Sequence, residues 1–398
     1  MQTLAGALTI DLTTRDGVVR AVDIASTRPQ VADRLLAGQS AVAAIAVVPR
    51  LFSVCGRAQG IAAELALHAS RIELRQRDER ELGVRVAGST VEDIARSRRI
   101  ETEIAQEYLW RALLDWPQQV GLTADPTALA ALRRALDADP AGTAPATREA
   151  LRDAVERHVL GGDAQAWYAH EHVPAFEIWI AQAPTAAARL LGAVQRDGAR
   201  HGAPAVPAEV PLLPALTDAA VLRSLAAVLA DDPHFARLPI WSDRPAETGA
   251  VARMHGHPLV AALQSAYGRS TLTRLAARIT ELARIACGAP APTPLFGWMP
   301  LPAAGGLRRG LGWVETARGV LAHLIDAEGS ARNERIVHYR ILAPTEWNFH
   351  PRGALAAGLL GAHVGDEAEL RRRAQWLVQA LDPCVAHELR LHAEAAHA

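Results

Sequence analysis

Residues 343–352 read Ala-Pro-Thr-Glu-Trp-Asn-Phe-His-Pro-Arg, and two stretches with the alternation of β-strands precede them. Apolar side chains recur at 320–325 and 336–342 on either side of a Glu-Gly-Ser turn at 328–330, which predicts an antiparallel strand pair. The segment Glu315-Thr316-Ala317-Arg318-Gly319 opens this pair, and residues 343–352 close it. Polar and aromatic residues thus frame a strand pair toward the C-terminal end of the chain.

Two cysteine segments stand at opposite ends of the sequence. Cys55 precedes Gly56 and a strongly helix-forming stretch. Because a thiol at a helix N-terminus meets the positive end of the helix dipole, we expect Cys55 to lose its proton readily and to ligate a soft metal. Cys384 follows a helix that is predicted to end at Leu381, and Pro383 stiffens the turn that would point its thiol into a site.

The rest of the chain is predicted to be mostly helical. Residues 8–24 alternate about an Arg-Asp-Gly turn and predict a β-hairpin. Further helices are predicted at 89–116, 126–137, 145–160, 182–196, 216–231 and 258–287. Two Pro/Gly-rich stretches predict an extended linker at 202–214 and a long loop at 288–312. The expected fold class is α+β, predominantly helical, with small β-hairpins near both ends.

Composition excludes several classes of function. The 398 residues carry 42 basic and 43 acidic side chains, so a formal charge of −1 gives no reason to expect a nucleic-acid or membrane partner. Every basic residue is arginine, which excludes a P-loop lysine and Schiff-base chemistry. The three cysteines cannot form a disulfide framework, and the first residues lack the features of a signal peptide, so a cytoplasmic location is expected.

The blocks at residue 315, at residue 344 and around both cysteines resemble the large subunit of nickel–iron hydrogenases. That family has R-x-C-G-x-C near its start, then E-A-P-R-G, a strand pair and P-T-T-W-N, and finally D-P-C-x-x-C. The matching residues of the middle blocks are Glu315, Arg318, Gly319, Pro344, Thr345, Trp347, Asn348, Pro351 and Arg352. Order and spacing fit along nearly the whole chain.

The resemblance implies one large-subunit-like domain spanning residues 1–398. Its expected parts are a hairpin with the first cysteine motif at 1–70, a helical middle at 71–287, the loop at 288–312, and the strand pair with the second cysteine motif at 313–398.

The chain departs from the family pattern at metal ligands. By position, Cys55 matches a cysteine that bridges the two metals and Cys384 matches a terminal nickel ligand. Phe52 and His387 stand where their partner cysteines would be, and two thiolates do not suffice for nickel. The family's E-G-H, which supplies a proton-transfer glutamate, reads Ala5-Gly6-Ala7. The resemblance therefore implies no hydrogen-splitting activity, and the protein is not expected to be an enzyme.

Other matches to the family survive. The family usually has a histidine four residues after the bridging cysteine, and this chain has Gln59 there. Arg318, however, matches the family's arginine over the diatomic ligands of the iron, and Asp382 matches an acidic neighbour of that pocket. A guanidinium can donate hydrogen bonds to cyanide nitrogens, and its fixed positive charge offsets the negative charge of the cyanide ligands in an Fe(CN)2(CO) unit. Two thiolates, with such a guanidinium over the diatomic ligands, suit the binding of iron without nickel.

The pattern is similar to that of HupK/HoxV-type hydrogenase accessory proteins, which resemble a large subunit but lack part of its metal ligation. This similarity implies a non-catalytic assembly platform that holds the Fe(CN)2(CO) fragment on Cys55 and Cys384, with no nickel. The implied partners are a HypC-type maturation chaperone and the immature hydrogenase large subunit.

The sequence leaves other interpretations open. The protein could be a metal-free mimic of the large subunit that binds immature hydrogenase or its chaperones. Arg318 could form a structural pair with Glu315, and Cys384 with His387 could bind zinc, although no second ligand pair is adjacent. Cys287 has no matched role, and participation of His387 or Cys287 in metal binding is left undecided.

Overall fold

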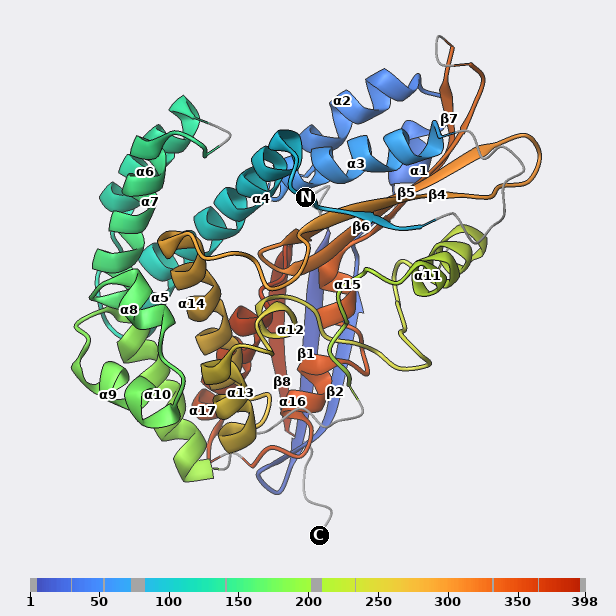
Figure 1. The fold of residues 1–398 in the computed structure, drawn as a ribbon. Coiled ribbons are helices and arrows are strands. Elements are labelled where there is room, and N and C mark those ends of the chain that lie inside the picture. Colours follow the sequence, from blue (N-terminus) through green and yellow to red (C-terminus); the bar gives the residue numbers. More distant parts are fainter. Residues whose placement is uncertain are drawn as a thin grey trace.

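The computed structural model describes residues 6–29, 31–52, 54–72, 83–139, 142–201, 210–232, 234–330, 333–363 and 365–393. Helices predominate, and the described strands form one sheet of three and one of five (Figure 1). The α+β fold class is confirmed. In the described parts of the chain, no helix combines the length and the apolar character needed to cross a membrane.

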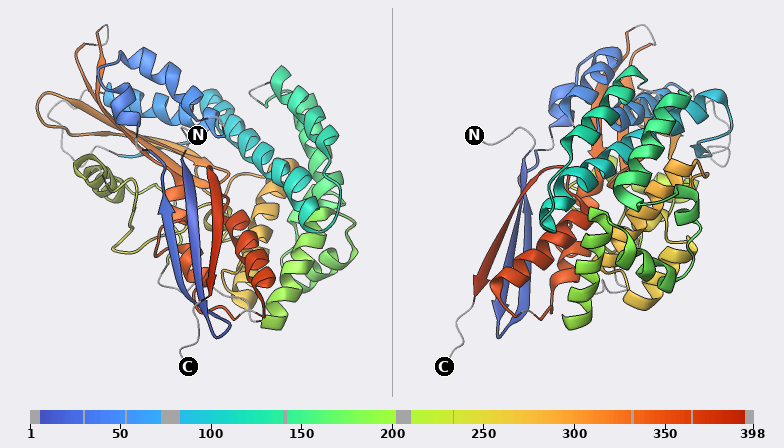
Figure 2. Two further views of the ribbon diagram at one scale, coloured as in Figure 1. Left: turned by 180° about the vertical axis from the view of Figure 1, so that it is seen from behind. Right: turned by 90° about the vertical axis from the view of Figure 1, so that its left-hand side faces the viewer.

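The predicted N-terminal hairpin is present as β1 (Ala7–Arg15) and β2 (Val18–Ser26). Its turn uses left-handed backbone at Asp16 and Gly17. A third strand that the sequence analysis did not predict, β8 (Ala386–Ala393), pairs in parallel with the outer edge of β1. Figure 2 shows this strand of the C-terminal region beside the strands of the N-terminal hairpin. Segments from opposite ends of the sequence therefore share one sheet.

The five-stranded sheet is larger than the predicted strand pair. In the order β3 (Arg85–Val86), β4 (Phe296–Leu301), β5 (Arg308–Thr316), β6 (Gly319–Glu328) and β7 (Arg335–Leu342), all neighbours are antiparallel. The pairing of β6 with β7 confirms the prediction. The prediction of a long loop at 288–312 is wrong, because β4 and most of β5 lie within that range.

Glycines explain the difference, because glycine-rich sequence is typical of loops but here allows a helix to pack closely against a strand. Helix α3 (Gly56–Ser70) packs directly on β5. A β-carbon at Gly312 would lie 2.5 Å from both the carbonyl oxygen of Ala62 and the amide nitrogen of Ala66, and one at Gly310 would overlap the carbonyl of Ala66. Only glycine permits this close approach of a helix backbone to a strand.

The helices cover the sheets and follow the predicted ranges with a few breaks. The segment predicted at 89–116 is α4 (Val91–Trp110), a π-helical turn (Arg111–Asp115) and α5 (Trp116–Gln119). The segment predicted at 258–287 is two helices, α13 (Pro258–Tyr267) and α14 (Thr271–Cys287), because Gly268 takes a positive φ of 60°. Residues 202–209 of the predicted linker lie outside the described residues.

The remaining helices are α1 (Ala32–Leu36), α2 (Ala41–Leu51), α6 (Pro126–Ala138), α7 (Pro145–Val155) with a second π-helical turn (Glu156–Leu160), α8 (Ala164–Tyr168), α9 (Val173–Gln182), α10 (Ala186–His201), α11 (Ala219–Asp231), α12 (Ala250–Arg253), α15 (Pro344–Asn348), α16 (Ala354–Leu359) and α17 (Glu367–Leu381).

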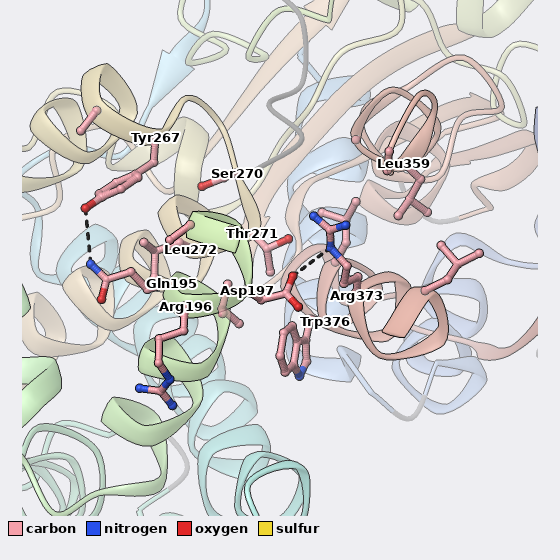
Figure 3. A pocket seen from close by; sticks show the side chains of 18 of the residues that line it. Gln195, Arg196, Asp197, Tyr267, Ser270, Thr271, Leu272, Leu359, Arg373 and Trp376 are labelled. Atoms are coloured by element: carbon pink, nitrogen blue, oxygen red, sulfur yellow. Dashed lines mark hydrogen bonds and ion pairs between the residues drawn. The ribbon is translucent and has the colours of Figure 1, made fainter. Parts of the chain in front are cut away.

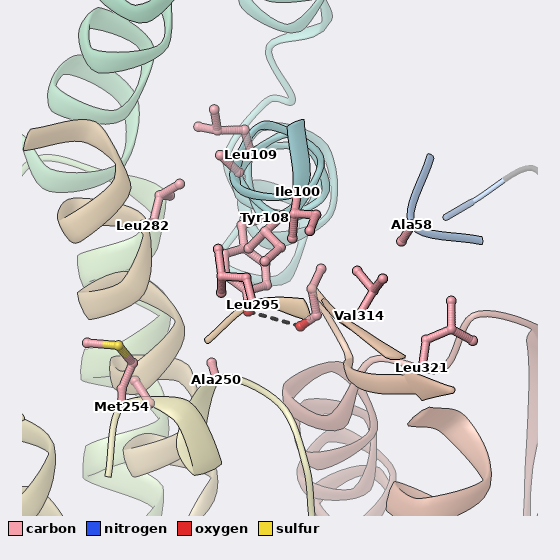
Figure 4. Close-up of a cluster of buried hydrophobic side chains, with 14 of the residues drawn as sticks. Ala58, Ile100, Tyr108, Leu109, Ala250, Met254, Leu282, Leu295, Val314 and Leu321 are labelled. Carbon is pink, nitrogen blue, oxygen red and sulfur yellow. Dashed lines mark hydrogen bonds between the residues drawn. The ribbon is translucent and has the colours of Figure 1, made fainter. Parts of the chain in front are cut away.

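Tyr108 on α4 lies at the centre of the largest apolar cluster, among side chains from α14 and the sheet (Figure 4). Its hydroxyl is 2.8 Å from Glu281 Oε2, and Arg253 donates from Nε to Glu281 Oε1 at 2.6 Å. Arg253 Nη1 also donates to Glu315 Oε2 at 2.6 Å. This buried network fixes the end of β5, and with it the turn that carries Arg318.

Candidate metal-binding site

The two cysteines meet in one site although they come from opposite ends of the sequence. Cys55 is the residue that precedes α3, and Cys384 lies in the short segment between α17 and β8. After burial, the nearby Cys384 has the largest effect on the pKa of Cys55, and both thiols also affect the pKa of the buried Arg28 and Arg318. Neither thiol is in a disulfide.

The position of Cys384 follows from how α17 ends. The helix stops at Leu381 because Asp382 takes left-handed backbone with a φ of 53° and Pro383 follows. Thr345 then holds the thiol: its hydroxyl lies 3.0 Å from Cys384 Sγ and accepts the Cys384 amide N–H at 3.2 Å. The motif at 343–352 thus supplies a direct contact to the second cysteine.

The expectation that Cys55 loses its proton readily is wrong. Burial, together with the Cys384 thiol and the Glu103 carboxylate, raises the pKa of Cys55 to about 12. The N–H groups of Arg57 and Ala58 at the start of α3 donate to Glu103, at 3.0 and 2.9 Å, rather than to the thiol. The Glu103 carboxyl group from α4 therefore occupies the favourable end of the helix dipole, and the free thiol stays protonated.

One donor does face the Cys55 sulfur. Gln59 Nε2 lies 3.5 Å from Cys55 Sγ, and Gln59 Oε1 lies 2.9 Å from Nε2 of the buried His323. Burial lowers the pKa of His323 to about 3, so its ring is neutral. Since an amide oxygen only accepts, His323 donates from Nε2 and accepts at Nδ1 from the Tyr339 hydroxyl, 2.8 Å away. This chain of hydrogen bonds orients the Gln59 amide toward the thiol.

Arg318 and Asp382 also meet at this site, as the resemblance implied. Arg318 Nη2 lies 3.4 Å from Asp382 Oδ2 and 3.1 Å from Glu107 Oε2. The alternative pairing of Arg318 with Glu315 is wrong, because Glu315 is bound by Arg253. Burial would raise the pKa of Asp382, but the guanidinium groups of Arg318 and Arg111 outweigh it and lower that pKa. The Nε of Arg318 is buried and has no hydrogen-bond partner among the described residues.

A second arginine at the thiols was missed by the sequence analysis. Arg28, in the segment after β2, donates to Cys384 Sγ at 3.4 Å and to the two carboxylate oxygens of Glu346 at 3.4 and 3.2 Å. Glu346 stands at the second threonine of the family's P-T-T-W-N, so a buried carboxylate in a matching motif was the available signal that a cation lies nearby.

A cleft of 1180 Å³ opens beside the site, lined by α3, α4 and the segment of Cys384. Among its lining residues are Glu103, Glu107, Arg111, Arg318 and Cys384. A second cavity of 580 Å³ lies between α10, α14 and α17, where Asp197 and Arg373 form an ion pair (Figure 3). It shares no lining residue with the cysteine cleft and has no contact with the thiols.

The described residues contain no group of three or more His, Cys, Asp or Glu side chains arranged to hold a metal ion. Cys287 donates to the carbonyl of Arg284 at the end of α14. His387 is an exposed residue of β8 whose neighbour across the sheet is Leu8. A metal bound by Cys55 and Cys384 would therefore need ligands that do not come from these side chains.

The raised pKa of the Glu103 carboxyl group predicts how the stability of the fold depends on pH. Burial raises its pKa from the ordinary 4.5 to about 7, so between these values the folded protein binds more protons than the unfolded chain. The contribution of Glu103 to the free energy of unfolding should therefore fall by about 2 to 3 kcal/mol as the pH rises through this window. We expect the Glu103→Gln variant to lack this fall when urea unfolding is measured at pH 5 and at pH 8. Parallel losses in both proteins would contradict the assignment.

The chain resembles known proteins in sequence along nearly its whole length. Residues 299–388 match the family model described as nickel-dependent hydrogenase. The chain is 37% identical to the hydrogenase expression/formation protein HoxV of Cupriavidus necator, over 97% of this chain and 96% of the relative. It is 34% identical to the hydrogenase expression/formation protein HupK of Rhizobium leguminosarum bv. viciae, over 99% of this chain and 98% of the relative.

Solved structures show the same fold at low sequence identity. The reduced Ni-Fe-Se hydrogenase of D. vulgaris Hildenborough superimposes with a TM-score of 0.58 and 15% identity, covering 93% of this chain and 94% of that one. The Ni-Fe-Se hydrogenase of Desulfomicrobium baculatum gives 0.54 and 16%, covering 94% and 95%. These likenesses confirm the large-subunit-like fold, and the full-length relatives identify the family. The chain belongs to the HoxV- and HupK-type hydrogenase expression/formation proteins.

Proposed function

We propose that this protein is a non-catalytic maturation factor that carries the Fe(CN)2(CO) fragment of the nickel–iron site on Cys55 and Cys384 and passes it to the hydrogenase large subunit. The observation that carries the proposal is the convergence of two free thiols beside Arg318, whose buried Nε has no hydrogen-bond partner among the described residues. A guanidinium N–H directed at a cyanide nitrogen would satisfy that atom.

The donor set suits iron that arrives with its own ligands. Two thiolates leave most coordination positions to be filled from elsewhere, and one carbonyl and two cyanides fill three of them. Nickel bound by thiolates alone would need further sulfur, and Phe52 stands at one of the positions where the family has it. The fragment is cargo here, and the residues that hold it are Cys55, Cys384 and Arg318.

The protonated thiol of Cys55 suits temporary binding. A metal must displace the thiol proton, so a thiol with a pKa of about 12 holds iron less firmly at neutral pH than a thiolate would. The cleft beside the site offers a route for exchange. We propose a HypC-type chaperone as donor and the immature large subunit as acceptor, in the cytoplasm, where thiols stay reduced.

A second candidate function is that of a metal-free mimic of the large subunit, which binds immature hydrogenase or its chaperones. The observation that favours it is that Cys384 already has hydrogen-bond donors in Thr345 and Arg28. In this case the thiols would be fold determinants and the surface would be the functional part.

Infrared spectroscopy separates the two candidates. We expect protein purified without oxygen, from cells that contain the maturation machinery, to show cyanide and carbonyl stretching bands and iron near one atom per chain. Protein free of iron and of these bands, but still associated with the large subunit, would support the mimic and refute the carrier.

A further inference from the structure

Arg28 is held in contact with the site by three kinds of interaction. Its side chain is only 10% exposed, and its charge is balanced by the buried carboxylate of Glu346. The guanidinium carbon lies 5.8 Å from the centre of the Phe52 ring, and Nη1 lies 3.4 Å from Cys384 Sγ. The cation therefore lies against both the second thiol and the residue that replaces a family cysteine.

The charge of Arg28 is fixed. Burial disfavours the charged form of the guanidinium, but Glu346, Cys384 and Cys55 outweigh that effect and raise the pKa of Arg28. The guanidinium therefore stays protonated at every physiological pH. Arg318 is a second fixed cation that acts on the same two thiols. A metal that approaches the sulfur atoms thus meets two guanidinium groups. Each is paired with a carboxylate (Glu346 for Arg28, Glu107 and Asp382 for Arg318), but the guanidinium of Arg28 is the group that contacts sulfur.

Such a site distinguishes metal species by their charge. A bare Zn²⁺, Co²⁺ or Ni²⁺ ion brings two positive charges and is repelled by the arginines. In Fe(CN)2(CO), the two cyanides cancel the charge of Fe²⁺, and the cyanide nitrogens accept hydrogen bonds from the same arginines. Repulsion thus weakens binding of the bare ion, while the ligated iron gains contacts.

We infer that Arg28, together with Arg318, makes the dithiol site selective by charge, so that it rejects bare divalent cations and accepts iron already neutralised by cyanide. This inference rests on the proposed function, because it names the form of the cargo that the same two thiols accept. Arg28 is the specificity-determining residue, and Glu346 positions it.

Thiol chemistry explains why the site needs to exclude bare divalent cations. Soft thiolate ligands bind zinc well, and a convergent pair of thiols would otherwise take up free zinc before the iron fragment arrives. A purely structural purpose explains Arg28 less well, because a buried ion pair is often no more stabilising than apolar side chains of similar volume. A structural ion pair with Glu346 also gives no reason for Arg28 Nη1 to contact the sulfur atom of Cys384.

Titration of the metal-free, reduced protein with Co²⁺ tests the inference, with the sulfur-to-cobalt charge-transfer absorption as the signal and Zn²⁺ competition as a second measure. The double variant Arg28→Gln/Glu346→Gln removes the ion pair and keeps its shape. Because the guanidinium contacts sulfur and the carboxylate does not, the double variant should bind Co²⁺ at least about tenfold more tightly than the wild type.

Two single variants make the test specific. Glu346→Gln leaves the cation unbalanced and should weaken Co²⁺ binding at least about threefold, whereas Arg28→Lys keeps the charge and should stay close to the wild type. A general loss of structure would weaken binding in every variant, so the opposite shifts identify a charge effect. Equal affinities of the wild type and the double variant, or tighter binding by Glu346→Gln, would overturn the inference.

The outcome is independent of the infrared experiment. If wild-type protein lacks cyanide and carbonyl bands while the order of Co²⁺ affinities holds, the carrier proposal fails and the rejection of bare cations stands. If the bands are present and the order of affinities does not hold, the carrier stands and Arg28 is not its selectivity residue.

Discussion

Cys55→Ala and Cys384→Ala are each expected to abolish the cyanide and carbonyl bands of anaerobically purified protein and to reduce its iron content to background. With one thiolate left, the iron would have only a single protein ligand, and hydrogen bonds from Arg318 cannot replace a metal–sulfur bond. The fold should persist, because the thiols accept hydrogen bonds whose loss costs only about 1 kcal/mol each.

Cys287→Ala is the matched control, since its thiol donates to the carbonyl of Arg284 at the end of α14 and lies outside the site. This variant should keep the wild-type infrared bands. Circular dichroism of all three variants should show unchanged secondary structure. Bands that survive in both Cys55→Ala and Cys384→Ala would refute these two residues as the iron ligands.

Gly312→Ala is expected to lower the free energy of unfolding by about 3 kcal/mol, because an added methyl group forces α3 away from β5. Its β-carbon would lie 2.5 Å from backbone atoms of Ala62 and Ala66, which cannot move independently of the helix. Urea unfolding followed by circular dichroism measures the loss. The variant should also bind less iron, because α3 begins directly after Cys55.

Gly256→Ala provides the control for that substitution. Nothing lies within 4 Å of a β-carbon at Gly256, so its stability should match the wild type to within about 0.5 kcal/mol. Equal stabilities of the Gly312 and Gly256 variants would show that α3 and β5 do not require the close approach described for them.

Much of the fold could be predicted because it depends on local patterns. Alternating apolar residues predicted the hairpin and the pairing of β6 with β7, and the helix stripe before Asp382 predicted the end of α17. The motif at 343–352 pointed to the hydrogenase large subunit, and that resemblance placed Arg318 and Asp382 in one pocket. The structure brings both together with the two cysteines.

The rest depends on contacts between distant segments, which local patterns do not encode. Gly310 and Gly312 read as loop residues because nothing near them in the sequence shows that α3 lies against them. The raised pKa of Cys55 comes from burial and from Glu103 on another helix. No sequence motif marks Arg28. Its presence at the site follows from the buried carboxylate of Glu346, which requires a cation nearby.

The parallel pairing of β8 with β1 has a consequence for when the site can exist. The Cys384 segment is held between α17 and a strand that needs the N-terminal hairpin as its template. During translation Cys55 emerges long before Cys384, and it stays without this partner thiol until the segment after α17 has left the ribosome. A nascent chain that still lacks the Cys384 segment therefore cannot present the thiol pair of this site to a metal, and it cannot yet receive the proposed iron fragment.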